Sequence, residues 1–78
     1  MIKVSVVLYS YLREKLPAEA KGKTELQLQD GACIADVIAR LDLPEQVTFA
    51  VNNQIEREHG RQLQDGDVLR FFRAGAGG

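Results

Sequence analysis

The residues of this chain that could do chemistry lie at its C-terminal end, where the reacting group would be a backbone carboxylate. The sequence ends in Gly77-Gly78, after a strand-like run over residues 67–72 and a short Ala/Gly segment over residues 74–78. Glycine has no Cβ, so it adopts backbone conformations closed to other residues and can pass through a narrow enzyme channel. The alternative is an inert tail, because chain ends are often disordered.

The other candidate side chains do not form a catalytic or metal-binding set. Cys33 and His59 are the only cysteine and histidine. Cys33 lies at a predicted helix N-cap, where a thiol can be reactive, but a small, partly buried residue is the favoured interpretation. His59 lies in a polar loop, which favours a solvated side chain over a metal ligand. Without a nucleophile–histidine–acid set or a glycine-rich phosphate loop, the sequence indicates that the chain is not a catalyst by itself.

Composition indicates one small globular domain. Of its 78 residues, 45% are hydrophobic and 27% are charged, and the formal net charge is -1. This balance argues against general nucleic-acid binding. One cysteine excludes an intramolecular disulfide and fits a reducing cytoplasm. Neither a leader-like segment nor a long apolar run is visible, so we expect neither secretion nor membrane insertion.

Two stretches near the N-terminus alternate in a way that indicates β-strands. Apolar side chains occupy the even-numbered positions of residues 2–8, and this face is expected to be buried. Residues 24–29 alternate similarly and end at a turn over Asp30-Gly31. Between the two strands, residues 11–16 favour a brief helical turn that Pro17 stops. We expect the two strands to form a hairpin.

The middle of the chain contains the main predicted helix, over residues 33–41. Apolar side chains recur there at spacings of three and four, which gives one apolar stripe. Pro44 prevents the helix from continuing, and residues 47–51 then alternate as a third strand. Asn52-Asn53 is a turn signal, because asparagine tolerates left-handed conformations.

The last third of the chain is predicted to contain a short strand, a loop and the final strand. Ile55 begins the short strand, and residues 56–61 are polar enough to form an exposed loop. A turn over residues 64–67 leads into the final strand.

These elements, in this order, predict an α+β fold of the β-grasp type: a mixed sheet of four to five strands with one main helix packed across it. A right-handed crossover brings the last strand beside the first. The domain is expected to cover residues 1–73, and residues 74–78 to form a flexible tail. The predicted core consists of Val4, Val6, Leu26, Leu28, Ile34, Val37, Ile38, Leu41, Phe49, Val51, Leu63, Leu69 and Phe71.

Alternation in the final strand also predicts an apolar patch beside the tail. If Leu69 and Phe71 face the core, then Val68, Arg70 and Phe72 face outward, as do Val7 and Tyr9 on the first strand. Phe72 beside Val7 would then form the patch. Apolar patches rimmed by charge commonly bind partner proteins, although single exposed hydrophobic side chains are ordinary surface. The candidate partner-binding residues are Val7, Arg70, Phe72, Arg73, Gly75 and Ala76.

Three sequence features together resemble a known family. The chain opens with Met1-Ile2-Lys3-Val4, has Leu63-Gln64-Asp65-Gly66-Asp67-Val68 before Phe71-Phe72, and ends in Gly77-Gly78. Over its whole length it resembles the MoaD/ThiS family of ubiquitin-like sulfur carriers. The resemblance implies a ubiquitin-like β-grasp fold and a carrier, not an enzyme.

The resemblance also implies a specific chemistry and a set of partners. An E1-like enzyme of the MoeB/ThiF type would use ATP and magnesium to adenylate the carboxylate of Gly78, with Gly77 as a spacer. Sulfur from a donor such as a cysteine desulfurase would then displace AMP and leave a thiocarboxylate. The carrier itself would bind no cofactor.

The receiving enzyme implied by the resemblance is the large subunit of molybdopterin synthase or a thiazole synthase of thiamin formation. The opening residues and Phe71-Phe72 resemble the molybdopterin branch more closely, in which the chain would be the small subunit of the synthase. The tail departs from that branch, because Arg73-Ala74 stand where two prolines are common. Without proline the tail loses more conformational freedom on binding.

Two other classes of function remain open from the sequence. Adenylation of Gly78 could instead lead to a protein modifier that is joined to lysines of its targets. The chain could also be a ubiquitin-like interaction domain with an inert tail. Deletion of Gly78 distinguishes the inert domain, which would tolerate it, from the carrier and the modifier, which would not.

Overall fold

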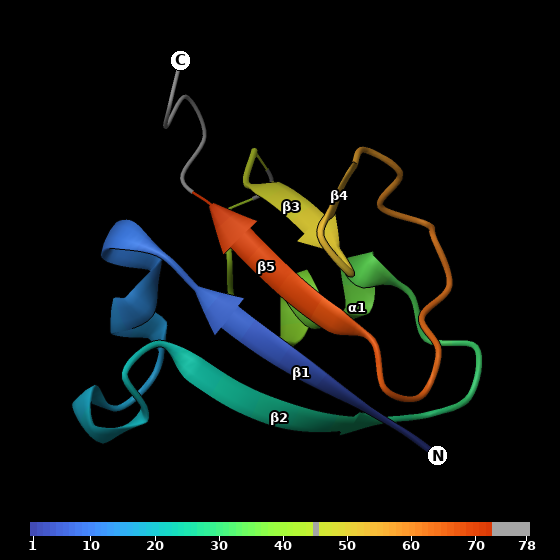
Figure 1. The fold of residues 1–78 in the computed structure, drawn as a ribbon, viewed down its shortest axis with the longest axis horizontal. Coiled ribbons are helices and arrows are strands. Elements are labelled where there is room, and N and C mark those ends of the chain that lie inside the picture. Colours follow the sequence, from blue (N-terminus) through green and yellow to red (C-terminus); the bar gives the residue numbers. More distant parts are fainter. Residues whose placement is uncertain (45, 73–78) are drawn as a thin grey trace.

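A five-stranded mixed sheet with one α-helix across one of its faces forms the described part of the chain (Figure 1). The computed structural model describes residues 1–44 and 46–72. The predicted boundary between domain and tail, at residues 73 and 74, lies outside these ranges. The elements are β1 (Ile2–Leu8), the 3-10 helices η1 (Ser10–Lys15) and η2 (Ala18–Ala20), β2 (Lys23–Leu28), α1 (Ile34–Arg40), β3 (Thr48–Val51), β4 (Gln54–Glu56) and β5 (Val68–Phe72).

The strand order is β2-β1-β5-β3-β4. β1 is antiparallel to β2, which confirms the predicted hairpin, and parallel to β5, which confirms that the last strand lies beside the first. β3 is antiparallel to both β5 and β4. The fold is therefore the β-grasp predicted from the order of elements, and β4 completes the sheet as its fifth strand.

The core lies between α1 and the sheet. Alternation places Val4, Val6 and Leu8 of β1 on the buried face, and Leu69 and Phe71 of β5 beside them. The apolar stripe of α1 packs onto the same face, and Figure 1 shows the helix behind β5 and β3, with the other face of the sheet toward the viewer. The sheet thus has one buried face and one open face.

The predicted core needs a correction at its margins. Leu26 and Leu41 are only partly buried, because Leu26 lies on the edge strand β2 and Leu41 follows the end of α1. Buried hydrophobic residues missing from the predicted core list are Leu12, Leu43, Val47, Ala50 and Leu8, although the strand face that carries Leu8 was expected to be buried. Ala50 differs from the rest, since its neighbours Phe49 and Val51 belong to the core cluster and Ala50 faces the opposite way.

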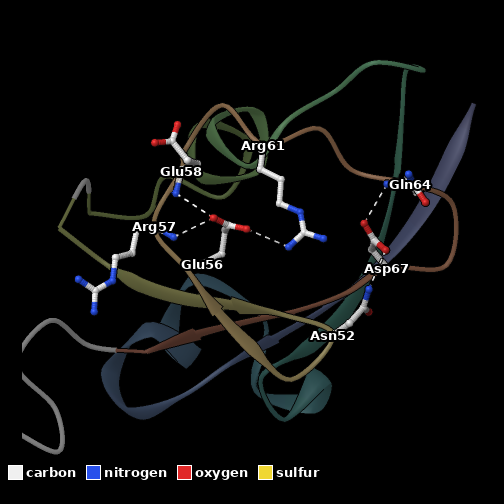
Figure 2. Close-up of polar contacts among 7 residues, drawn as sticks. All are labelled: Asn52, Glu56, Arg57, Glu58, Arg61, Gln64 and Asp67. Atoms are coloured by element: carbon white, nitrogen blue, oxygen red, sulfur yellow. Dashed lines mark hydrogen bonds and ion pairs between the residues drawn. The ribbon is translucent and has the colours of Figure 1, made fainter.

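A buried carboxylate fixes the turn before β5 (Figure 2). Asp67 accepts hydrogen bonds from the Gln64 N–H (2.9 Å) and from the Asn52 side-chain amide (3.0 Å). The Asn52 side-chain oxygen accepts in turn from the Val68 N–H (2.9 Å). These bonds join the β3–β4 turn to the start of β5, so the register of the central strand is pinned on the side away from the tail.

Candidate functional site

The candidate site is the open face of the sheet at the C-terminal end of β5. Leu69 and Phe71 are buried, at 1% and 0% exposure, whereas Val68, Arg70 and Phe72 are half-buried on the opposite face. This alternation is the one from which the outward-facing residues were predicted. Because β5 is the central strand of the sheet, its outward side chains have neighbours on both sides.

Phe72 is covered by an aromatic neighbour from the other end of the sequence. The rings of Tyr9 and Phe72 stack, with centroids 4.9 Å apart and planes at 6°. The Tyr9 N–H also donates to the Phe71 carbonyl oxygen (3.2 Å), which extends the pairing beyond β1. Stacked pairs of this kind contribute about 0.5–1.5 kcal/mol beyond area burial. The end of β5 is therefore held by both backbone and side chains.

The sequence predicted that Val7 lies beside Phe72, but the two residues are not direct neighbours in the sheet. In the parallel register Val7 is opposite Arg70, and Phe72 is two residues further along, level with Tyr9. Val7 is half-buried on the open face. The apolar surface at this end is thus formed by the Tyr9–Phe72 pair, with Val7 in the next row of the sheet.

Arg70 is fixed on the open face by a neutral acceptor. Its Nη1 donates to Oδ1 of Asn53 at 2.6 Å. Asn53 lies in the two-residue turn between β3 and β4, in which both asparagines have positive φ (51° and 73°). The sequence indicated this turn but not the role of the Asn53 side chain, because the contact joins residues 17 positions apart.

The remaining predicted site residues are Arg73, Gly75, Ala76, Gly77 and Gly78, and they lie outside the described residues. Their roles therefore stay predictions. Figure 1 shows that β1 and β5 end on the same side of the sheet. Phe72, at the end of β5, is the described residue nearest in sequence to these five residues.

The loop after β4 has a structural role that was not part of the prediction of an exposed polar loop. Glu56 accepts the N–H groups of Arg57 (3.1 Å) and Glu58 (3.2 Å), and Arg61 Nη1 (3.0 Å) (Figure 2). The carbonyl oxygen of His59 accepts the Ala35 N–H (2.9 Å) in the first turn of α1. The loop thus caps the helix.

His59 and Cys33 also have identifiable structural surroundings. The His59 ring is exposed and packs edge-on against Phe49, with centroids 5.1 Å apart. Cys33 is the N-cap residue of α1 and forms a capping box with Asp36 in the first turn. In it, the Cys33 N–H donates to the carboxylate of Asp36 at 2.8 Å. In residues 1–44 and 46–72, groups of three or more His, Cys, Asp and Glu that could hold a metal ion are absent.

The Glu56 network gives a pH-dependent prediction. The N–H groups of Glu58 and Arg57 and the Arg61 guanidinium hold the pKa of the Glu56 carboxyl below its ordinary value of 4.5. A lowered pKa means that the folded state binds fewer protons than the unfolded state. The stabilisation is therefore complete above pH 4.5 and is lost as the pH falls through the folded-state pKa.

We expect Glu56→Gln to lower the free energy of unfolding at neutral pH and to have a smaller effect in acid. Urea denaturation of both proteins at about pH 7 and about pH 3 measures this difference. The exposed carboxylate Glu14, changed to Gln, is the control. A Glu56→Gln effect of the same size at both pH values would contradict the assignment.

A five-stranded mixed sheet with one main helix is the β-grasp fold of ubiquitin-like proteins. Within that class, the chain belongs to the ThiS family, whose description its sequence matches over residues 6–78. The family consists of carrier proteins and not of enzymes, and it implies an E1-like activating partner. A search of curated protein sequences gave no match.

Three solved structures share the fold. A protein from Pyrococcus furiosus described as "putative molybdopterin converting factor, subunit 1" has a TM-score of 0.73 at 24% identity, covering 92% of this chain and 97% of its own. Small archaeal modifier protein 1 of Haloferax volcanii has a TM-score of 0.74 at 15% identity, covering 92% and 97%. The HVO 2177 protein of Haloferax volcanii has a TM-score of 0.78 at 18% identity, covering 99% and 87%.

None of the helices in the described ranges is both long and apolar enough to cross a membrane.

Proposed function

We propose that this protein is a sulfur carrier whose Gly78 carboxylate is adenylated by an E1-like enzyme and then converted to a thiocarboxylate. The observation that carries the proposal is the match to the ThiS family, which runs through Gly77 and Gly78. The open sheet face beside β5 supports it, because an activating enzyme must hold the domain while it reaches the tail. Gly77 is the spacer, and its lack of a side chain lets Gly78 enter a narrow site.

The chemistry follows from the leaving groups. A carboxylate resists attack by sulfur because its oxygen is a poor leaving group. When the carboxylate attacks the α-phosphorus of ATP, pyrophosphate leaves and an acyl-adenylate forms. A sulfide sulfur can then attack the carbonyl carbon, release AMP and leave the thiocarboxylate. A persulfide sulfur releases AMP in the same way but leaves an acyl disulfide, and a thiol must then reduce its S–S bond to release the thiocarboxylate. ATP and magnesium bind to the activating enzyme, so the carrier needs no cofactor of its own.

For the recipient, we favour the large subunit of molybdopterin synthase, with this chain as its small subunit in the cytoplasm. The support is the opening sequence, the Phe71-Phe72 pair and the shared fold of the Pyrococcus furiosus protein. A thiazole synthase is the alternative recipient. Arg73-Ala74, where the molybdopterin branch commonly has prolines, is the feature that argues against the first recipient.

A second candidate function is a protein modifier that uses the same activated Gly78. The shared fold of small archaeal modifier protein 1 favours it. Both functions need adenylation and differ in the acceptor, which is sulfur for a carrier and a lysine amine for a modifier. Lysine-linked adducts of higher mass in extracts of the native cells would favour the modifier.

The experiment that tests the shared step is ATP–pyrophosphate exchange with the E1-like enzyme from the same cells. Exchange is expected to depend on this protein and on magnesium, because only the acyl-adenylate step releases pyrophosphate reversibly. A reaction without the carrier is the control. Exchange that is equal with and without the carrier would overturn the proposed activation.

Phe72 gives a prediction for partner binding. We expect Phe72→Ala to weaken affinity for the activating enzyme about tenfold or more, since aromatic side chains at interface centres are frequent hot spots. The fold should remain, with a loss of about 1 kcal/mol from the Tyr9 stack. Calorimetric titration measures the affinity, and Tyr11→Ala, at an exposed aromatic outside the sheet, is the control. Unchanged affinity for Phe72→Ala would contradict the docking role.

A further inference from the structure

Arg70 lies at the middle of the open face of the sheet. The strand pairings place Val7 opposite Arg70 on one side and Ala50 opposite Arg70 on the other. The row continues to Lys23 on β2 and to Ile55 on β4. Arg70 is thus the central member of a row that contains two cations, three apolar side chains and no carboxylate.

The environment of Arg70 is partly dehydrated. Val7 is half-buried, and Ala50 is only 5% exposed although it faces away from the core. Its partners on the adjacent strands are Arg70 and Ile55, and both have longer side chains than Ala50. Arg70 itself is half-buried on this surface.

The acceptor of the Arg70 guanidinium is neutral, so this hydrogen bond does not compensate the positive charge. The guanidinium donates to the Asn53 amide oxygen, and the ion pairs formed within residues 1–44 and 46–72 involve other residues. A guanidinium has five N–H donors, so one bond to Asn53 fixes its orientation and leaves donors for a second acceptor. A protein that covered this surface without an anion would bury an uncompensated charge, which is strongly unfavourable.

We propose that Asn53 is a positioning residue that holds Arg70 ready to bind a carboxylate of the activating enzyme at the centre of the docking surface. This inference rests on the proposed function and adds to it the chemistry of the partner: an apolar surface with an Asp or Glu opposite Arg70. Charge complementarity favours this occupant, since an acidic group satisfies both the free donors and the charge.

The geometry of the β3–β4 turn allows a substitution at Asn53 that removes its contact with Arg70 without destabilising the fold. Asn53 has φ of 73° in a two-residue turn between antiparallel strands, and glycine is favoured at that position. Asn53→Gly therefore removes the acceptor of Arg70 while keeping the turn, so the free energy of unfolding should stay the same or rise. Asn53→Asp keeps an acceptor for Arg70 but makes it a carboxylate, so the charge of Arg70 is compensated within the carrier itself.

We expect Asn53→Gly to raise the KM for the carrier in ATP–pyrophosphate exchange by about threefold to tenfold, with kcat unchanged. Arg70→Ala should raise KM about tenfold and reduce its dependence on salt. The double variant should behave like Arg70→Ala, because Asn53 acts only through Arg70. Asn53→Asp should also raise KM, which a purely structural contact would not do. Glu14→Gln is the surface control.

The outcomes distinguish the inference from the function on which it rests. If Arg70→Ala raises KM but Asn53→Gly does not, the positioning role of Asn53 is wrong. A KM for Arg70→Ala equal to that of the unaltered protein would exclude a carboxylate opposite Arg70. If the unaltered protein supports no exchange at all, the proposed function fails and this inference fails with it.

Discussion

Deletion of Gly78 is expected to reduce adenylate formation about 100-fold or more while leaving the fold intact. The deletion moves the terminal carboxylate back by about 3.3–3.6 Å, the length of one extended residue. A displacement of about 1 Å at a reacting centre can already cost about 100-fold in rate. The change is large because the reacting atom is displaced, although the new terminal residue, Gly77, is also a glycine.

The measurement is ATP–pyrophosphate exchange at saturating carrier, with circular dichroism to verify folding. Ala74→Gly is the matched control, because it alters the same segment but keeps its length and its last two residues. We expect the control to react at a rate close to that of the unaltered protein. Full activity after deletion of Gly78 would instead support the ubiquitin-like domain with an inert tail.

The second large effect is expected from Phe71→Ala, which should lower the free energy of unfolding by about 3–5 kcal/mol. Phe71 is 0% exposed and packs against Phe49, with ring centroids 6.0 Å apart. Domains of this kind have total stabilities of about 5–15 kcal/mol, so the variant should be partly unfolded or close to it. Urea denaturation followed by circular dichroism measures the loss.

The adjacent residue provides the comparison, since Phe72 lies on the other face of the same strand. Phe72→Ala should cost about 1 kcal/mol in stability, and its main effect should be on partner affinity. Equal stability losses for the two variants would mean that β5 does not separate a core face from a docking face. Phe71→Ala should therefore be judged by its stability and Phe72→Ala by its binding.

The fold was predictable because its strongest signals are local. Alternation marks β1 and β5, and the helical spacing of apolar side chains marks α1. Two of the missed core residues belong to segments without such a period, since Leu12 lies in a 3-10 helix and Leu43 in the connection after α1. Val47 belongs to the alternating stretch 47–51 but lies just before the start of β3. Ala50 is buried although it faces away from the core, between Arg70 and Ile55 on the adjacent strands, and no pattern within its own strand indicates this.

The candidate site was predictable only in part. Alternation placed Arg70 and Phe72 on the outer face of β5, as observed. The Tyr9–Phe72 stack and the Arg70–Asn53 hydrogen bond depend on the register between strands that are distant in sequence. That register is set by tertiary contacts such as the bond between Asn52 and Asp67, which local patterns do not determine. The roles of Gly77 and Gly78 rest on the family and on chemistry.

Peptide-level mass spectrometry of the protein purified from its native cells tests the central claim most directly. The measurement examines residues 74–78 for replacement of one oxygen of the Gly78 carboxylate by sulfur. Localisation to Gly78 is essential, because oxidation of Met1 or Cys33 gives a nearly equal gain in mass. We expect sulfur on Gly78. A Gly78 carboxylate that stays unmodified, even after incubation with ATP, the E1-like enzyme and a sulfur donor, would contradict the carrier function.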